Sequence, residues 1–207
     1  MRYSPPPVRP ASPALQGGHL GHLLALARLH TPQAPLSIYY HRESVAACDK
    51  QRFLPPGIYV QKSLTLMLSQ QIVLVSGIGD FRLQRWQMKS IARLLSLSAT
   101  EARKILINPN WLPAELTSGL AEGMVSPFFA PDSAQTLPLA AVILLPLPLW
   151  LEESDQVSIS LSLRSSLLLP ARQLPAFITA YGLRYYPHIP VLTLSPPKVA
   201  LPPATSS

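Results

Sequence analysis

Residues 59–80 decide the fold of this chain, and they read YVQKSLTLMLSQQIVLVSGIGD. Two largely apolar runs, Tyr59–Leu68 and Gln71–Val75, stand on either side of the polar dipeptide Ser69-Gln70. Apolar runs of this length that are separated by two turn residues are typical of paired strands. The stretch therefore predicts a strand pair with its turn at residues 69–70.

Two helices are predicted directly after this strand pair. Asp80 is a residue type that often caps a helix, and it predicts a helix that runs to about Leu95. The sequence Ser98-Ala-Thr-Glu101 matches a capping box, in which each of the two side chains accepts a hydrogen bond from the backbone N–H of the other residue. This box predicts a second helix that ends at about Ile107.

Further elements are predicted on both sides of this region. One helix is expected at His19–His30 and another at Ala171–Tyr181, where Gly182 is the usual stop signal. Strand patterns occur at Leu36–Tyr40, Ala140–Leu145, Val157–Leu163 and Ser166–Leu169. Helices and strands in this mixed order predict an α/β fold of the mixed α+β kind, a single domain with a mixed, curved sheet of about six to seven strands flanked by helices.

Proline divides the chain into a domain and two tails. The 207 residues include 24 prolines, of which seven lie in residues 1–35 and five in residues 190–207. Neither of these two segments contains an Asp or Glu, and neither terminal stretch can bury much apolar surface. We expect a proline-rich disordered arm at residues 1–18, the folded domain at residues 19–194 and a proline-rich disordered tail at residues 195–207.

The composition excludes several classes of protein. A hydrophobic content of 48% is too high for disorder throughout the chain, and the single cysteine, Cys48, excludes a disulfide scaffold. The most apolar stretch, Leu137–Leu151, is short for a membrane-spanning helix and is interrupted by proline. The N-terminus has prolines where a signal peptide needs an apolar core. We therefore expect a cytoplasmic protein without a membrane partner.

Two clusters of reactive side chains have simpler interpretations. Cys48 follows His41 by seven residues, but a lone cysteine after Val-Ala-Ala is more often a small packed side chain than a nucleophile. Glu152, Glu153 and Asp155 could hold a metal, but such a cluster is more often a solvated loop.

Positive charge gathers in one part of the chain. Residues 50–104 hold nine basic and two acidic residues, although the net charge of the whole chain is only +7. On a helix over residues 81–95, four cations would fall within about 80° of one another: Arg82, Arg85, Lys89 and Arg93. Trp86 would flank this stripe, and the core face would carry Leu83, Ile91, Leu94 and Leu95. The stripe is either a nucleic-acid contact or the solvated outer face of an amphipathic helix.

Two segments resemble a known family. The strand Tyr59-Val-Gln-Lys62-Ser-Leu-Thr-Leu is similar to the lysine-bearing strand of the YbaK/prolyl-tRNA synthetase-associated editing domains. Thr117-Ser-Gly119 and Gly123-Met-Val-Ser-Pro127-Phe are similar to the segment of those domains that contains a GxxxP motif. The similarity extends over about residues 20–182, and its specific motifs are these two.

The resemblance implies an aminoacyl-tRNA deacylase that hydrolyses the ester of a mischarged tRNA, with aminoacyl-tRNA as its partner and no cofactor or metal. Lys62 would be the catalytic residue. The substrate-binding residues would be His41, Gly119, Gly123, Met124, Val125, Ser126 and Pro127. Because an aminoacyl ester is already activated, such a site mainly has to position water and stabilise the developing oxyanion.

Two other functions remain open at this point. Met124 and Phe129 stand where the family has glycines, and this favours a catalytically inactive module that binds aminoacyl groups or tRNA. The tails contain PxxP spacings such as Pro7-Val-Arg-Pro10, and these fit a protein-interaction module with a protein partner for the tails. The sequence leaves open which amino acid and which tRNA would be recognised.

Overall fold

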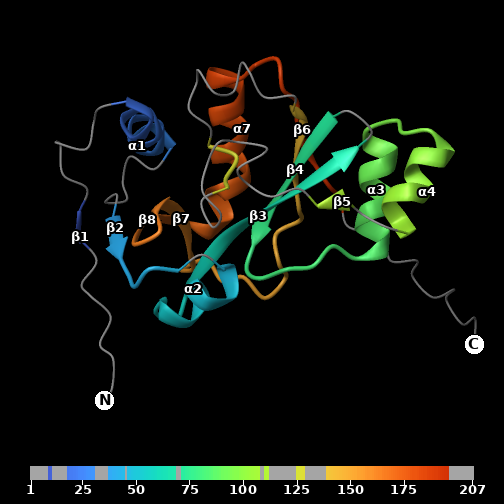
Figure 1. Cartoon of the computed structure of the whole chain (residues 1–207). Helices are drawn as coiled ribbons and strands as arrows, with labels where there is room; N and C mark the ends of the chain where they lie inside the picture. Colours follow the sequence, from blue (N-terminus) through green and yellow to red (C-terminus); the bar gives the residue numbers. More distant parts are fainter. Residues whose placement is uncertain are drawn as a thin grey trace, which may run out of the picture.

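The fold is a mixed β-sheet with helices on both faces, which confirms the predicted fold class (Figure 1). The computed structural model describes residues 9–10, 18–30, 37–44, 46–68, 71–107, 110–111, 125–128 and 139–195. At the centre of the sheet, β3 (Ile58–Leu68) and β4 (Gln71–Ile78) form an antiparallel hairpin with Leu68 opposite Gln71. The predicted strand pair is therefore confirmed, and its turn lies outside the described residues.

Seven further strands are present in the described part of the chain. They are β1 (Arg9–Pro10), β2 (Ser37–Tyr40), β5 (Asn110–Trp111), β6 (Leu139–Leu144), β7 (Gln156–Ser162), β8 (Ser165–Pro170) and β9 (Val191–Thr193). The strand order is β1-β2-β8-β7-β3-β4-β6-β9, and β5 pairs with β3 outside this path. The ladders β3–β7, β4–β6 and β6–β9 are parallel, and the others are antiparallel.

Alternating residues of the strands bury against different helices. One face packs against α1 (Gly18–His30) and α7 (Leu174–Tyr185), the latter preceded by a 3-10 turn at Ala171–Gln173. On the other face, α3 (Arg85–Leu94) and α4 (Ala99–Ile107) cover β4, β6 and the end of β3. The short helix α2 (Ala47–Phe53) lies on this second face as well, over the start of β3.

The capping box at the start of α4 is confirmed. The Ser98 N–H donates to the Glu101 carboxylate at 3.2 Å, and the Glu101 N–H donates to the Ser98 hydroxyl at 3.3 Å. These two bonds satisfy backbone donors that the first helical turn leaves without an intrahelical partner.

The predicted start of the preceding helix is wrong. Asp80 does not cap α3, which begins only at Arg85, with Gln84 as the flanking residue. The Gln84 N–H donates to the Gln87 side chain at 2.8 Å, so a glutamine pair takes the capping role. The prediction that Leu94 belongs to the core is also wrong, since this side chain is 42% exposed.

Gly182 does not end the last helix, because α7 continues to Tyr185. A Cβ atom at position 182 would lie 2.6 Å from Val191 Cγ2 and 3.0 Å from the Tyr186 ring. The glycine is therefore needed for close packing of α7 against β9 rather than for a turn.

Four elements were not predicted from the sequence, namely β1, α2, β5 and β9. The three strands have only two or three residues each and α2 has seven, so their apolar patterns are too brief to identify them. Among the described residues, no helix has the length and apolar character that crossing a membrane requires.

Candidate functional site

The candidate site lies where the sheet divides along one edge of β3. Residues Ile58–Val60 pair with β7 on this edge, and Leu66 and Met67 pair with β5 further along it. Between these ladders no described strand pairs with residues 61–64 on that edge. A cavity of about 260 Å³ opens here, between α2, β3 and β7. Its described lining is Ala46, Ala47, Cys48, Lys50, Val60, Gln61, Lys62, Ser63, Leu64, Asp80, Val125 and Ser160.

Lys62 is positioned by the turn that follows β4. Its Nζ donates to Asp80 Oδ1 at 2.5 Å and to the Phe81 carbonyl oxygen at 3.0 Å, and it lies 5.5 Å from the centre of the Phe81 ring. Gly77 is directly opposite Lys62 on β4, and a Cβ there would lie 3.0 Å from the Phe81 ring. The glycine therefore leaves room for Phe81. Asp80, misassigned as a helix cap, is the counter-ion of Lys62.

The segment that carries the GxxxP motif, residues 123–127, reaches the same cavity through Val125. Phe128 anchors the end of this segment, since its ring packs against Phe177 and Tyr181 of α7 with centres 5.0 and 5.2 Å away. The Tyr186 hydroxyl donates to the Pro127 carbonyl oxygen at 2.7 Å. The described structure thus brings Val125 and Lys62 to one cavity, although 62 residues separate them along the chain.

Lys50 is a residue of this cavity that the sequence did not single out. Its side chain projects from α2, is only 3% exposed, and donates to the Ser160 hydroxyl at 2.7 Å. Burial lowers the pKa of Lys50 from 10.5 to about 7. A buried cation is costly without a counter-charge. None of the described carboxylates lies within ion-pair distance of it.

His41 does not line the cavity but lies next to this lysine. It is buried, and its Nδ1 donates to the Arg42 carbonyl oxygen at 2.8 Å, which leaves Nε2 to accept from the Ser166 hydroxyl at 3.0 Å. Ser166 is the cross-strand neighbour of Ser160. Burial lowers the pKa of His41, the bond to Arg42 opposes this effect, and the charge of Lys50 lowers the pKa further. His41 is therefore held in its neutral form.

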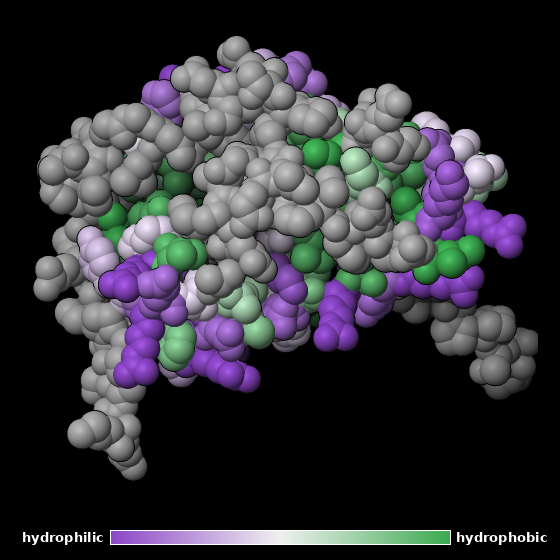
Figure 2. Space-filling model, viewed as in Figure 1, coloured by the Kyte–Doolittle hydropathy of each residue, from purple (hydrophilic) through white to green (hydrophobic). Residues whose placement is uncertain are grey.

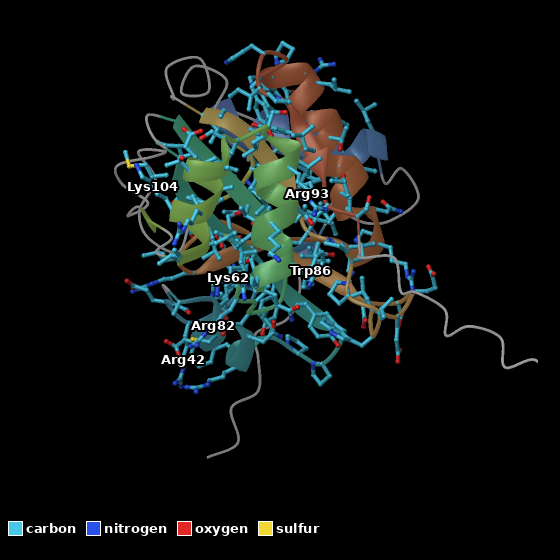
Figure 3. The ribbon with its side chains drawn as sticks, turned by 90° about the vertical axis from the view of Figure 1, so that its right-hand side faces the viewer. Arg42, Lys62, Arg82, Trp86, Arg93 and Lys104 are labelled. Carbon is cyan, nitrogen blue, oxygen red and sulfur yellow. The ribbon has the colours of Figure 1, made fainter. Side chains whose placement is uncertain are left out.

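The four predicted nucleic-acid contacts are all exposed, but they do not form one helical stripe. Arg85, Lys89 and Arg93 lie on α3, whereas Arg82 precedes the helix, so its placement on the stripe was wrong. None of the four forms an ion pair with a described acidic residue. In Figure 3, Lys62 lies near the N-terminal end of α3 and Arg93 lies toward the other end. Figure 2 shows hydrophilic side chains on the right-hand side of the molecule, where α3 and α4 lie in Figure 1.

Two further groups of side chains were considered in the sequence, namely Cys48 and the acidic residues Glu152, Glu153 and Asp155. Cys48 is exposed and lines the cavity, so the prediction that it is packed inside is wrong. The Asp155 carboxylate accepts from the Glu152 N–H at 2.7 Å, and Glu153 pairs with Arg172 at 3.0 Å. Within the described ranges, no group of three or more His, Cys, Asp or Glu residues could hold a metal ion.

The remaining predicted site residues have different positions. Ser126 is buried and its hydroxyl accepts from the Phe128 N–H at 3.0 Å, so it stiffens the loop. Gly119, Gly123 and Met124 lie outside the described residues. The sequence holds no signal that could have identified Lys50, because it follows Asp49 in a helix of seven residues, which is too short for its apolar pattern to identify a buried face.

Comparisons with known proteins leave the family open. No protein-family model matches the chain, and no curated protein matches it. The solved structures similar to the chain include one described as "Epitope backbone grafting by computational design for improved presentation of linear epitopes on scaffold proteins". It is 16% identical, the match covers 90% of this chain and 99% of that chain, and the TM-score is 0.46. This likeness is too weak to carry an argument about function.

Proposed function

We propose that the protein is an aminoacyl-tRNA deacylase that acts in trans on mischarged tRNA in the cytoplasm. The observation that carries the proposal is the cavity that Lys62 and Val125 share. These residues come from the two segments that resemble the editing family, and a site of that kind requires both at one place.

The reaction is hydrolysis of an ester. Water adds to the carbonyl carbon, the bond from that carbon to the ribose oxygen breaks, and the products are the free amino acid and the ribose hydroxyl of the tRNA. The transition state carries negative charge on the former carbonyl oxygen, so a fixed cation and backbone N–H donors accelerate the reaction. In this proposal Lys62 supplies the cation, the backbone N–H groups of Gly123 to Ser126 supply the donors, and Pro127 holds the loop stiff.

Exposed cations beside the cavity support a tRNA substrate. Arg82, Arg85, Lys89 and Arg93 are exposed on or just before α3, and Asp80 and Glu101 are the only acidic residues in 50–104. Lys and Arg side chains without carboxylate partners suit the phosphates of an RNA backbone. Trp86 is half-buried, and its Nε1 donates to Gln84 at 2.5 Å, which fixes its ring near this surface.

The test is a deacylation assay with the purified full chain and tRNA charged with alanine, serine or cysteine, including a proline tRNA. We expect loss of the ester with the wild type and a rate lower by about 10²-fold or more in Lys62→Ala. Lys104→Ala is the matched control, because Lys104 is an exposed lysine on α4, and it should hydrolyse as the wild type does. Equal rates in Lys62→Ala and the wild type would contradict the proposed role of Lys62.

A catalytically inactive tRNA-binding module is the second candidate. The observation that favours it is the pairing of Lys62 with Asp80 and the Phe81 carbonyl oxygen, which occupies the lysine. In that case no charged tRNA is hydrolysed by the wild type, while salt-sensitive tRNA binding is retained. The same assay therefore separates the two functions.

A further inference from the structure

The cavity contains a buried cation whose charge no described residue balances. Lys50 Nζ can donate three hydrogen bonds, and the bond to the Ser160 hydroxyl at 2.7 Å is the one shown by the described structure. A hydroxyl is neutral and cannot offset the cost of removing an ammonium group from water. The residue nevertheless lines the cavity.

The other charges around the cavity do not supply this balance. Asp80 is the acidic residue of the described lining. Its carboxylate forms an ion pair with Lys62 Nζ at 2.5 Å. His41, beside Lys50, is held neutral, and its Nε2 accepts a hydrogen bond from the Ser166 hydroxyl. The described lining around Lys50 is therefore neutral or positive apart from Asp80, and the Asp80 carboxylate pairs with Lys62.

The geometry points to an anion-binding site at Lys50: the cavity between α2, β3 and β7 takes a phosphate or carboxylate group in direct contact with Lys50 Nζ and the Ser160 hydroxyl. An anionic oxygen there would provide the missing counter-charge and accept the remaining donors of the ammonium group. A volume of about 260 Å³ accommodates such a group together with part of the molecule that carries it. The inference concerns binding and does not depend on the proposed hydrolysis.

The experiment measures binding of four probes to the full chain by isothermal titration calorimetry: inorganic phosphate, adenosine 5′-monophosphate, acetate and uncharged adenosine. We expect at least one of the three anions to bind the wild type. Uncharged adenosine should bind more weakly than that anion. Binding of phosphate and the nucleotide identifies a phosphate site, whereas binding of acetate identifies a carboxylate site.

The variants assign the binding to Lys50. Lys50→Met should weaken anion binding at least about tenfold, because it removes a buried charge that contacts the ligand. Lys50→Arg keeps the charge and should bind within a few-fold of the wild type, and it also guards against misfolding of the methionine variant. Lys104→Met is the matched control, since Lys104 is exposed on α4 and should bind as the wild type does.

Three results would overturn the inference. They are no binding of any anion at about 10 mM, a concentration that detects even millimolar affinity; equal binding by Lys50→Met and the wild type; and equal loss in Lys104→Met and Lys50→Met. The titrations with Lys50→Met and the hydrolysis assay with Lys62→Ala are separate measurements, so failure of the anion site and failure of the proposed hydrolysis are distinguishable.

Discussion

Lys62 and Lys50 line the same cavity, but their charges are met in different ways. The Lys62 side chain is 21% exposed and forms an ion pair with Asp80. Lys50 is almost wholly buried beside the Ser160 hydroxyl, which lowers its pKa to about 7, and no described carboxylate pairs with its cationic form. Lys62 was singled out from the sequence because its strand resembles the lysine-bearing strand of the editing family. Lys50 was not, because its burial depends on a helix too short to be predicted.

Lys50 makes the stability of the protein depend on pH. Its pKa is about 7 in the folded protein, below the ordinary value of 10.5, so the unfolded chain binds more protons between these pH values. The free energy of unfolding should therefore rise with pH in this range, by about 2 kcal/mol between about pH 7 and about pH 9. The altered pKa values of His41, Tyr181 and Tyr186 act outside this window, below 6.5 or above 10.0.

Urea unfolding at several pH values tests this dependence. Lys50→Met should lack the rise and should be at least as stable as the wild type at neutral pH, since it replaces a buried cation by an apolar side chain. Parallel stability curves for the wild type and Lys50→Met would contradict the assignment.

At the scale of elements, α3 shows how a tertiary contact can move the start of a helix. Asp80 has the residue type of a helix cap, but it follows Gly79 with its positive φ of 82° and turns its carboxylate to Lys62. Phe81 packs close to Gly77, residues 81–84 belong to no helix or strand, and Gln84 directly before α3 is extended. The buried stripe of α3 is accordingly Met88, Ile91 and Ala92.

The exposed side of α3 carries the prediction about nucleic acid. The double variant Arg85→Gln/Lys89→Gln should weaken tRNA binding and reduce the slope of log K against log salt by about 1.5, because each lost phosphate contact contributes roughly 0.7–0.9. The matched control is Arg28→Gln/Arg184→Gln, which removes two exposed cations from α1 and α7 on the other face. Equal slopes for both double variants, measured by filter binding, would show that α3 does not contact the tRNA.

At the scale of the whole molecule, the arrangement of β3 determines where a site can form. Parallel pairing with β7 at one end and antiparallel pairing with β5 further along leaves the middle of the strand free to line a cavity. The opposite edge of β3 is filled by β4, and the sheet continues through β6 to β9. The β4 side of the hairpin is therefore paired with β6, whereas residues 61–64 on the opposite edge of β3 have no described strand partner.

The last strand should mark the limit of the stable domain. Leu194 is buried and its N–H donates to the Leu144 carbonyl oxygen at 2.8 Å, directly after β9 pairs with β6. Truncation after Pro190 should lower the free energy of unfolding by at least about 2 kcal/mol, because it removes this buried leucine and a ladder of the sheet. Truncation after Ser195 should change it by no more than about 0.5 kcal/mol. Thermal unfolding of both truncated chains decides between these outcomes, and equal stability would place the boundary before β9.

The sequence by itself determined the mixed α/β class, the central hairpin, the capping box at Ser98 and the lysine at position 62. Each of these depends on residues that are close in the chain, where apolar periodicity and backbone capping act directly. Only the tertiary structure decided that Asp80 pairs with Lys62, that Gly182 serves close packing, and that Lys50 is buried at the cavity. These features depend on contacts between segments that are distant in sequence, so no local pattern records them.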